Sequence, residues 1–89
     1  MASFYTVLAR LEAYRTLLTV DRSSRDRALA FMDSLASDPF QEGSDVARDS
    51  SGREYQIRVV GKLVVYYWVD HAEKEVRIVD VVDADTAPA

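Results

Sequence analysis

Residues 54–82 read EYQIRVVGKLVVYYWVDHAEKEVRIVDVV and carry the strongest secondary-structure signal in the chain. In the first part, residues 54–60, the apolar Tyr55, Ile57 and Val59 alternate with polar side chains. This period of two is typical of a β-strand with one buried and one wetter face. We therefore predict a strand that buries these three residues.

The rest of this stretch predicts two more strands. Residues 63–69 have no polar alternation, as expected of a strand covered on both faces, and residues 76–82 form the third candidate. Gly61-Lys62 and the polar residues 70–74 are short enough to be turns. The sequence thus predicts an antiparallel meander with residues 63–69 as its central strand.

An amphipathic helix is predicted before this sheet. Its apolar stripe consists of Ala28, Leu29, Met32, Leu35 and Ala36. Asp21, Ser23 and Ser24 are candidate N-caps. The helix should end near Ser37, because Pro39 disfavours helical geometry at the preceding residue.

Two interpretations remain open for the start of the chain. Apolar residues recur at helical steps at Phe4, Val7, Leu8, Leu11, Tyr14 and Leu18. They indicate one face of a helix. The β-branched and aromatic residues Tyr5, Thr6 and Val7 equally suit a short edge strand that enters a helix near Ala9.

Two segments are predicted to lie outside the core. Residues 41–52 are polar, with Val46 as their only large apolar residue, and indicate an exposed connection. Residues 83–89 are small, acidic or proline and indicate a flexible tail. We expect residues 1–89 to form a single α+β domain. In it, N-terminal helices, with or without a preceding edge strand, pack on a mainly antiparallel sheet of three to four strands.

The composition narrows the class of partner. The 89 residues include 11 Lys and Arg against 15 Asp and Glu, a formal net charge of −4, which argues against binding to free nucleic acid. The chain has no cysteine, so thiolate metal sites and disulfides are excluded. No apolar run approaches the length of a membrane span. The expected location is the cytoplasm.

Three short motifs resemble the RelE/ParE superfamily of bacterial toxins. They are LASDP at residues 35–39, YQIRV at 55–59 and VVY at 64–66. In that superfamily a helix ends in a similar leucine-to-proline segment. Its sheet carries a tyrosine-arginine-isoleucine-arginine-valine strand followed by an arginine-valine-isoleucine-tyrosine strand. The likeness covers roughly residues 28–82 and implies a RelE/ParE-like fold.

The departures from this pattern fall on positions that imply RNA cleavage in the family. Leu63 stands where the second sheet motif has an arginine, which in RNA-cleaving members helps to bind the phosphate. The basic residue that follows the last strand in those members is replaced by Val82-Asp83-Ala84-Asp85. Loss of one such electrostatic donor commonly costs about a hundredfold in rate. We therefore expect ribonuclease activity to be weak or absent.

Arg58 is the candidate catalytic or binding cation, since it matches the first sheet motif and should project from the polar face of its strand. Lys62 and Arg53 flank the same strand and would extend it into a small basic patch. The alternative for Arg58 is a surface arginine paired with an acid such as Asp80 or Glu54. No cofactor or metal motif is present in the sequence.

The aromatic run in the central strand also has two interpretations. Tyr66, Tyr67 and Trp68 could form a stacking platform for bases. Within an unbroken apolar run, a core role is favoured, with Tyr66 or Trp68 facing the helices.

The resemblance implies a toxin-like component of a type II toxin–antitoxin system, with an antitoxin as partner and the ribosome or DNA gyrase as target. One alternative is a non-toxic module that keeps the scaffold for binding, for instance as a homodimer through a strand edge or the N-terminal helix. The other is a ribosome-dependent mRNA endoribonuclease with an altered site that uses Arg58, Lys62 and a tyrosine.

Overall fold

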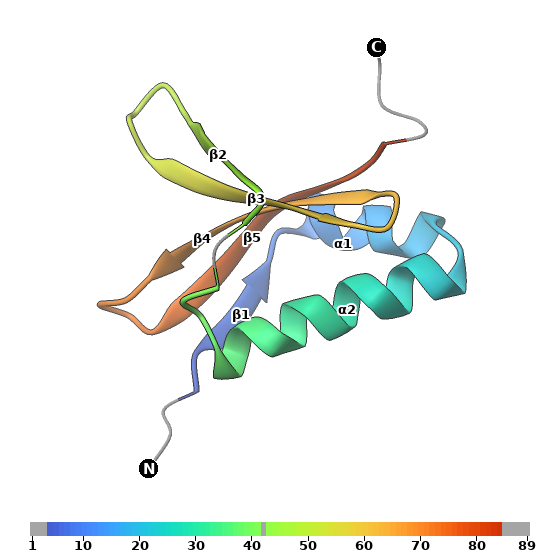
Figure 1. The fold of residues 1–89 in the computed structure, drawn as a ribbon, viewed down its shortest axis with the longest axis horizontal. Helices are drawn as coiled ribbons and strands as arrows, with labels where there is room; N and C mark the ends of the chain where they lie inside the picture. Colours follow the sequence, from blue (N-terminus) through green and yellow to red (C-terminus); the bar gives the residue numbers. More distant parts are fainter. Residues whose placement is uncertain (1–3, 42, 85–89) are drawn as a thin grey trace.

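Two helices cover one side of a five-stranded sheet in the computed structural model, which describes residues 4–41 and 43–84 (Figure 1). The elements are β1 (Thr6–Ala9), α1 (Leu11–Thr19), α2 (Arg22–Ser37), β2 (Asp45–Arg48), β3 (Glu54–Val60), β4 (Leu63–Asp70) and β5 (Glu75–Asp83). The strand order is β1-β5-β4-β3-β2, and all neighbours are antiparallel except β1 and β5. The predicted α+β class and antiparallel meander are confirmed, and the sheet has one strand more than expected.

The additional strand is β2, which lies in the segment predicted to be an exposed connection. It pairs antiparallel with β3, with Val46 opposite Gln56. The Ser44 amide donates to the Ile57 carbonyl (2.8 Å) just before β2 begins. Backbone pairing, rather than apolar burial, holds this edge strand, so the hydrophobic pattern could not reveal it.

At the start of the chain, the edge-strand interpretation is confirmed. β1 runs parallel to β5, with Val7 opposite Val76, and α1 follows from Leu11. The helical face predicted for this region is wrong, however. α1 buries Ala13 and Leu17, whereas the predicted face is exposed at Leu11, Tyr14 and Leu18. The small Ala13 side chain allows α1 to lie close against β5.

α2 has the predicted boundaries. It ends at Ser37, and its N-cap is Asp21, whose Oδ2 accepts a hydrogen bond from the Ser24 amide (3.0 Å). Within the predicted stripe Ala28, Met32 and Leu35 are buried, and Leu29 is exposed. In the described ranges, neither helix is long and apolar enough to cross a membrane.

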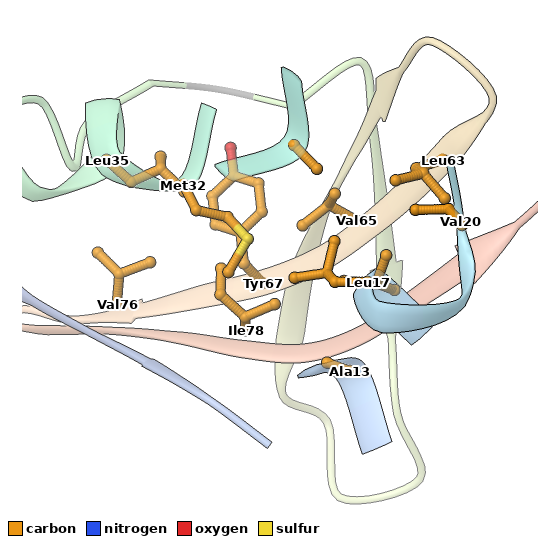
Figure 2. Packing of buried hydrophobic residues seen from close by; sticks show 12 residues of the cluster. Ala13, Leu17, Val20, Met32, Leu35, Leu63, Val65, Tyr67, Val76 and Ile78 are labelled. Carbon is orange, nitrogen blue, oxygen red and sulfur yellow. The ribbon is translucent and has the colours of Figure 1, made fainter. Parts of the chain in front are cut away.

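The core lies between the helices and one face of the sheet (Figure 2). The strands contribute Leu63, Val65 and Tyr67 from β4 and Val76, Ile78 and Val81 from β5. An irregularity in the β4–β5 register between Tyr66 and Tyr67 leaves Val79 unpaired. This bulge allows both Ile78 and Val81 to face the helices.

Tyr67 is therefore the aromatic residue of β4 that faces the helices, and the prediction that Tyr66 or Trp68 would do so is wrong. The Tyr67 hydroxyl donates to the Gln41 carbonyl (3.0 Å), and burial raises the pKa of this phenol. Because side chains alternate along a strand, Tyr66 and Trp68 lie on the opposite face of the sheet.

We call the face away from the helices the open face. One row across it is formed by Leu8, Arg77 and Trp68, which are neighbours in register, and by Tyr55 on β3. The alternation predicted for β3 is thus correct, but its direction is reversed. Tyr55, Ile57 and Val59 lie on the open face, where Val59 is exposed.

The end of β5 is more ordered than predicted. Asp83 is its last residue, and the Ala84 amide donates to the Lys62 carbonyl (2.9 Å). The predicted flexible tail therefore does not include these two residues, and residues 85–89 lie outside the described part of the chain.

Candidate functional site

Two arginines lie over the ring of the single tryptophan of the chain on the open face, and a third arginine, Arg10, lines a hollow beside them. The Cζ atom of Arg53 lies 4.2 Å from the centroid of the Trp68 ring, and that of Arg77 lies 5.6 Å away. The hollow has a volume of about 310 Å³ and is lined by Leu8, Ala9, Arg10, Arg53, Tyr55, Trp68, Arg77, Ile78 and Val79. We call Arg10, Arg53, Tyr55, Trp68 and Arg77 the arginine–tryptophan surface.

Contacts with Trp68 and Glu75 position two of the three guanidinium groups. Each cation–π contact with Trp68 is within the range of about 6 Å where such attraction is significant. Arg77 Nη2 also contacts Glu75 Oε1 at 2.7 Å, within the same strand. Arg53 covers the indole ring at short range, so a base could stack there only by displacing it. The surface therefore presents guanidinium edges, which suit a carboxylate or a phosphate.

The turn between β2 and β3 holds Arg53 and Tyr55 through one carboxylate. Asp49 accepts hydrogen bonds from the Ser51 amide and hydroxyl (2.9 and 2.6 Å), the Arg53 amide (3.0 Å) and the Tyr55 hydroxyl (2.7 Å). The Ser51 and Tyr55 hydroxyls hold the pKa of the Asp49 carboxyl well below its usual value. The same bond to Asp49 raises the pKa of Tyr55.

Asp49→Asn is expected to lower the melting temperature near neutral pH, because a neutral amide accepts these bonds more weakly than a carboxylate. The folded-state pKa is depressed, so this stabilisation is present above the unfolded-state value of 3.8 and is lost as the pH falls through the folded value. The difference between wild type and variant should therefore narrow below about pH 4. Thermal melts from pH 7 to pH 2.5 measure it, and a constant difference would contradict this assignment.

The structure separates the three cations predicted from the sequence. Arg53 lies on the open face. Arg58 lies on the helix side of the sheet, opposite Val65, with its Cζ 5.3 Å from the Phe31 ring centroid. Lys62 Nζ forms an ion pair with Asp21 Oδ1 (3.0 Å) at the start of α2. The predicted basic patch of Arg53, Arg58 and Lys62 therefore does not form.

Sequence reasoning missed Arg10 and Arg77, and it favoured a core role for Trp68 and a buried position for Tyr55. Arg77 and Trp68 are cross-strand partners, and the Arg10 amide donates to the Ile78 carbonyl (3.1 Å). Polar and apolar residues alternate at the start of residues 75–80, and this pattern could have predicted that Arg77 lies on the polar face of its strand. The pairing of β1 with β5, which brings Arg10 to the same place, is not visible in the sequence.

Leu63 does not lie on the open face. It is fully buried in the core on the helix side. An arginine at this position of this chain would point into the core rather than toward a phosphate on the open face. The inference that Leu63 marks a lost phosphate ligand therefore lacks support in the geometry.

A second cluster of aromatic and titratable side chains lies at the turn between β4 and β5. A hydrogen bond joins the Tyr5 hydroxyl to Nδ1 of His71 (2.9 Å), and the Phe40 ring stacks on the imidazole with centroids 4.8 Å apart. His71 is exposed. Among the described residues, no group of three His, Cys, Asp or Glu side chains could hold a metal ion.

The fold is similar to that of chains from two solved toxin–antitoxin complexes. One is the archaeal RelE–RelB complex of Pyrococcus horikoshii OT3, with a TM-score of 0.76, 19% identity and coverage of 98% of this chain and 100% of that chain. The other is the RelBE2 complex of Mycobacterium tuberculosis, with a TM-score of 0.76, 22% identity and coverage of 96% and 98%.

The sequence itself matches no protein-family model and no curated protein. The fold implied by the resemblance of the short motifs is thus confirmed by the three-dimensional arrangement of the elements. The described part of the chain has a RelE-like fold.

Proposed function

We propose that this protein is a toxin-like component of a type II toxin–antitoxin system, which acts by binding a macromolecule with weak or absent RNA cleavage. The observation that carries the proposal is the arginine–tryptophan surface on the open face of a RelE/ParE fold. Both similar structures were solved as toxin–antitoxin complexes, which supports an antitoxin as the partner of this chain. We also propose that it acts in the cytoplasm, where such a target and antitoxin would be met.

The distribution of charge supports contact with a single anionic group of the partner rather than general binding to nucleic acid. The chain has a net charge of −4, yet three of its 11 basic residues line one hollow. Long-range attraction to a polyanion is therefore weak, while a single carboxylate or phosphate at the hollow meets several guanidinium groups. A phosphate presented by the ribosome and an acidic surface of a protein such as gyrase both fit this description.

The chemistry of the surface favours binding over cleavage. RNA hydrolysis needs groups that move protons to and from the reacting oxygens. Arginine stays protonated in proteins and does not take this role. The Tyr55 hydroxyl already donates to Asp49, and this bond raises its pKa, so the phenolate that could accept a proton is scarcely populated near neutral pH.

One feature supports the alternative of an endoribonuclease with an altered site. Tyr66 and Asp80 line an adjoining hollow of about 260 Å³ together with Arg10 and Tyr55. Purified protein incubated with ribosomes and mRNA tests this alternative. Cleavage that disappears in Tyr66→Phe or Asp80→Asn would replace our proposal with it.

Induced expression is expected to arrest growth, and Arg53→Ala combined with Arg77→Ala is expected to abolish the arrest. Each lost hydrogen bond to a charged group costs about 1.5–3 kcal/mol, so binding to the target should weaken at least about a hundredfold. Arg22→Ala is the matched control, because the Arg22 side chain is 90% exposed on α2, away from the sheet. Separate assays of translation and DNA supercoiling then show whether the target is the ribosome or gyrase.

Binding can be followed directly through the fluorescence of Trp68, the only tryptophan in the chain. The emission should change when the target occupies the arginine–tryptophan surface, and it should not change in the double variant. Growth that continues unimpaired on wild-type expression would favour the non-toxic binding module, including its homodimeric form.

A further inference from the structure

A second hollow on the open face adjoins the arginine–tryptophan surface. Its volume is about 260 Å³, and it is lined by Arg10, Tyr55, Tyr66, Val79, Asp80 and Val82. Arg10, Tyr55 and Val79 also line the first hollow. The two hollows are therefore neighbours that share one guanidinium group, that of Arg10. We call the second one the Arg10–Asp80 hollow.

Strand pairing brings opposite charges to this hollow. Tyr66 on β4 is the register partner of Asp80 on β5, so both side chains lie on the open face. Val79, the unpaired residue of the bulge, directly precedes Asp80. The Arg10 amide donates to the Ile78 carbonyl (3.1 Å), which holds the end of β1 beside the bulge. A guanidinium and a carboxylate thus border one small space.

Three polar groups of the hollow are not engaged by other side chains. Within residues 4–41 and 43–84, neither Arg10 nor Asp80 forms an ion pair, and the Tyr66 hydroxyl makes no hydrogen bond. Asp80 Oδ1 accepts a hydrogen bond from the neighbouring Val81 amide (2.9 Å), which leaves Oδ2 to a ligand. The hollow therefore offers a positive charge, a negative charge and a hydroxyl.

We propose that the Arg10–Asp80 hollow binds a free α-amino acid with an apolar side chain. The Arg10 guanidinium receives the carboxylate of the ligand, because its planar fork can form two parallel hydrogen bonds to such a group. Asp80 Oδ2 and the Tyr66 hydroxyl receive the ammonium group. The apolar side chain of the ligand lies against Val79 and Val82.

The presence of both charges selects this class of ligand. A phosphate or a simple carboxylic acid is attracted by Arg10 but repelled by Asp80, and for an amine the two effects are reversed. A zwitterion satisfies both groups. Drug-sized ligands occupy pockets of about 300–1,000 Å³, so this smaller hollow suits a smaller molecule. Because both charged residues are exposed, water screens the contacts, and we expect a Kd of about 1–10 mM.

The shared Arg10 connects this ligand to target binding, a consequence that rests on the proposed function. An amino acid that holds the Arg10 guanidinium withdraws it from the arginine–tryptophan surface, which keeps Arg53 and Arg77. The amino acid and an anionic target therefore weaken each other's binding, by the same factor in both directions. We expect a factor of about two to five, because one exposed charge contact of several is lost. The concentration of the amino acid thereby regulates how strongly the protein holds its target.

Amide NMR shifts of the full chain measure the binding of L-leucine. We expect saturable shifts at Arg10, Val79 and Asp80. Isopentylamine and 4-methylpentanoate, which each lack one charged group of leucine, should bind at least about threefold more weakly. Glycine, which lacks the apolar side chain, should also bind more weakly. The absence of saturable shifts at these residues, or equal affinity for leucine and any of these three compounds, overturns the proposal.

Two variants with matched controls test the residues. Arg10→Gln and Asp80→Asn should each weaken leucine binding by at least about threefold, whereas Arg22→Gln and Asp45→Asn should leave it unchanged. Asp45 closely matches Asp80, because its Oδ1 also accepts from the next amide, that of Val46 (2.8 Å), but it does not line the hollow. All four side chains are exposed, so we expect the variants to fold, which thermal melts check. Equal affinity of all four variants refutes the site.

Competition with inorganic phosphate tests the coupling. Phosphate binding at the arginine–tryptophan surface is followed through the fluorescence of Trp68, with and without saturating leucine. We expect leucine to weaken phosphate binding by about twofold to fivefold in the wild type and to have no effect in Arg10→Gln. Phosphate that does not perturb Trp68, or whose affinity leucine leaves unchanged, overturns the coupling. Leucine binding is measured on the isolated protein, so growth without arrest on induced expression refutes the toxin function alone.

Discussion

Replacing Leu63 by arginine is expected to destabilise the fold by at least about 4 kcal/mol, not to create a ribonuclease. The change introduces the arginine of the family motif at its corresponding position. Leu63 is 0% exposed within the apolar cluster beneath the helices, so the new guanidinium would be buried without an acidic partner. Loss of a buried leucine and burial of an unpaired charge are both among the most destabilising changes known.

Urea unfolding measures this effect, because a loss of this size is a large part of the total stability of a small domain. Leu63→Met is the control, since it conserves volume and should cost less than about 1.5 kcal/mol. Lys62→Arg adds the same guanidinium one residue earlier, at a partly exposed position, and should be nearly neutral. A stable Leu63→Arg protein that cleaves RNA would show that Leu63 does occupy a site on the functional surface.

Gly43→Ala is the second change with a large expected effect, about 3 kcal/mol. A Cβ atom on Gly43 would lie 2.5 Å from the Ile57 carbonyl oxygen and 2.9 Å from its nitrogen. These are backbone atoms of β3 and cannot rotate away, so β2 must move. That movement strains the bonds from the Gly43 amide to Gln56 Oε1 (2.9 Å) and from the Ser44 amide to Ile57 (2.8 Å).

Gly52→Ala provides a matched control for this prediction. Gly52 has φ 87°, and a Cβ atom there meets nothing within 4 Å. Its cost should be about 1 kcal/mol, from backbone conformation alone. Hydrogen exchange distinguishes the two variants, because only Gly43→Ala should reduce the protection of amides along β2. Equal losses in both variants would contradict the role of close approach at Gly43.

Local patterns in the sequence located most of the elements, but they did not fix which way these elements face. Alternation along Tyr55, Ile57 and Val59 correctly indicated a strand, yet these residues face away from the helices. The neighbouring strand at residues 63–69 is apolar on both faces, so nothing in its sequence indicates which face the helices cover. α1 likewise has two apolar sides, so its sequence does not indicate which of them is buried. The side with the small Ala13 is the one that packs against the sheet.

Of the five residues of the arginine–tryptophan surface, only Arg53 was predicted as a site residue from the sequence, for a related reason. Arg53 was identified because it adjoins a recognisable strand. Arg58 belongs to the YQIRV motif, but the alternation of side chains along β3 places it on the helix side of the sheet, near the Phe31 ring. Arg10 and Arg77 come together only through the parallel pairing of β1 with β5, which is a long-range contact. Patterns of period two or 3.6 contain no information about such a contact.

The parallel pairing of β1 with β5 also bears on the order in which the chain folds. The three strands β3, β4 and β5 are joined by short turns and can pair locally, whereas β1 must find β5 across almost the whole described chain. Contacts between distant residues require a costly loop closure and slow the folding of small domains. We therefore expect the local meander to form first and the docking of β1 and α1 on it to be the late step. The arginine–tryptophan surface, which needs Arg10 as well as Arg77, exists only once that step is complete.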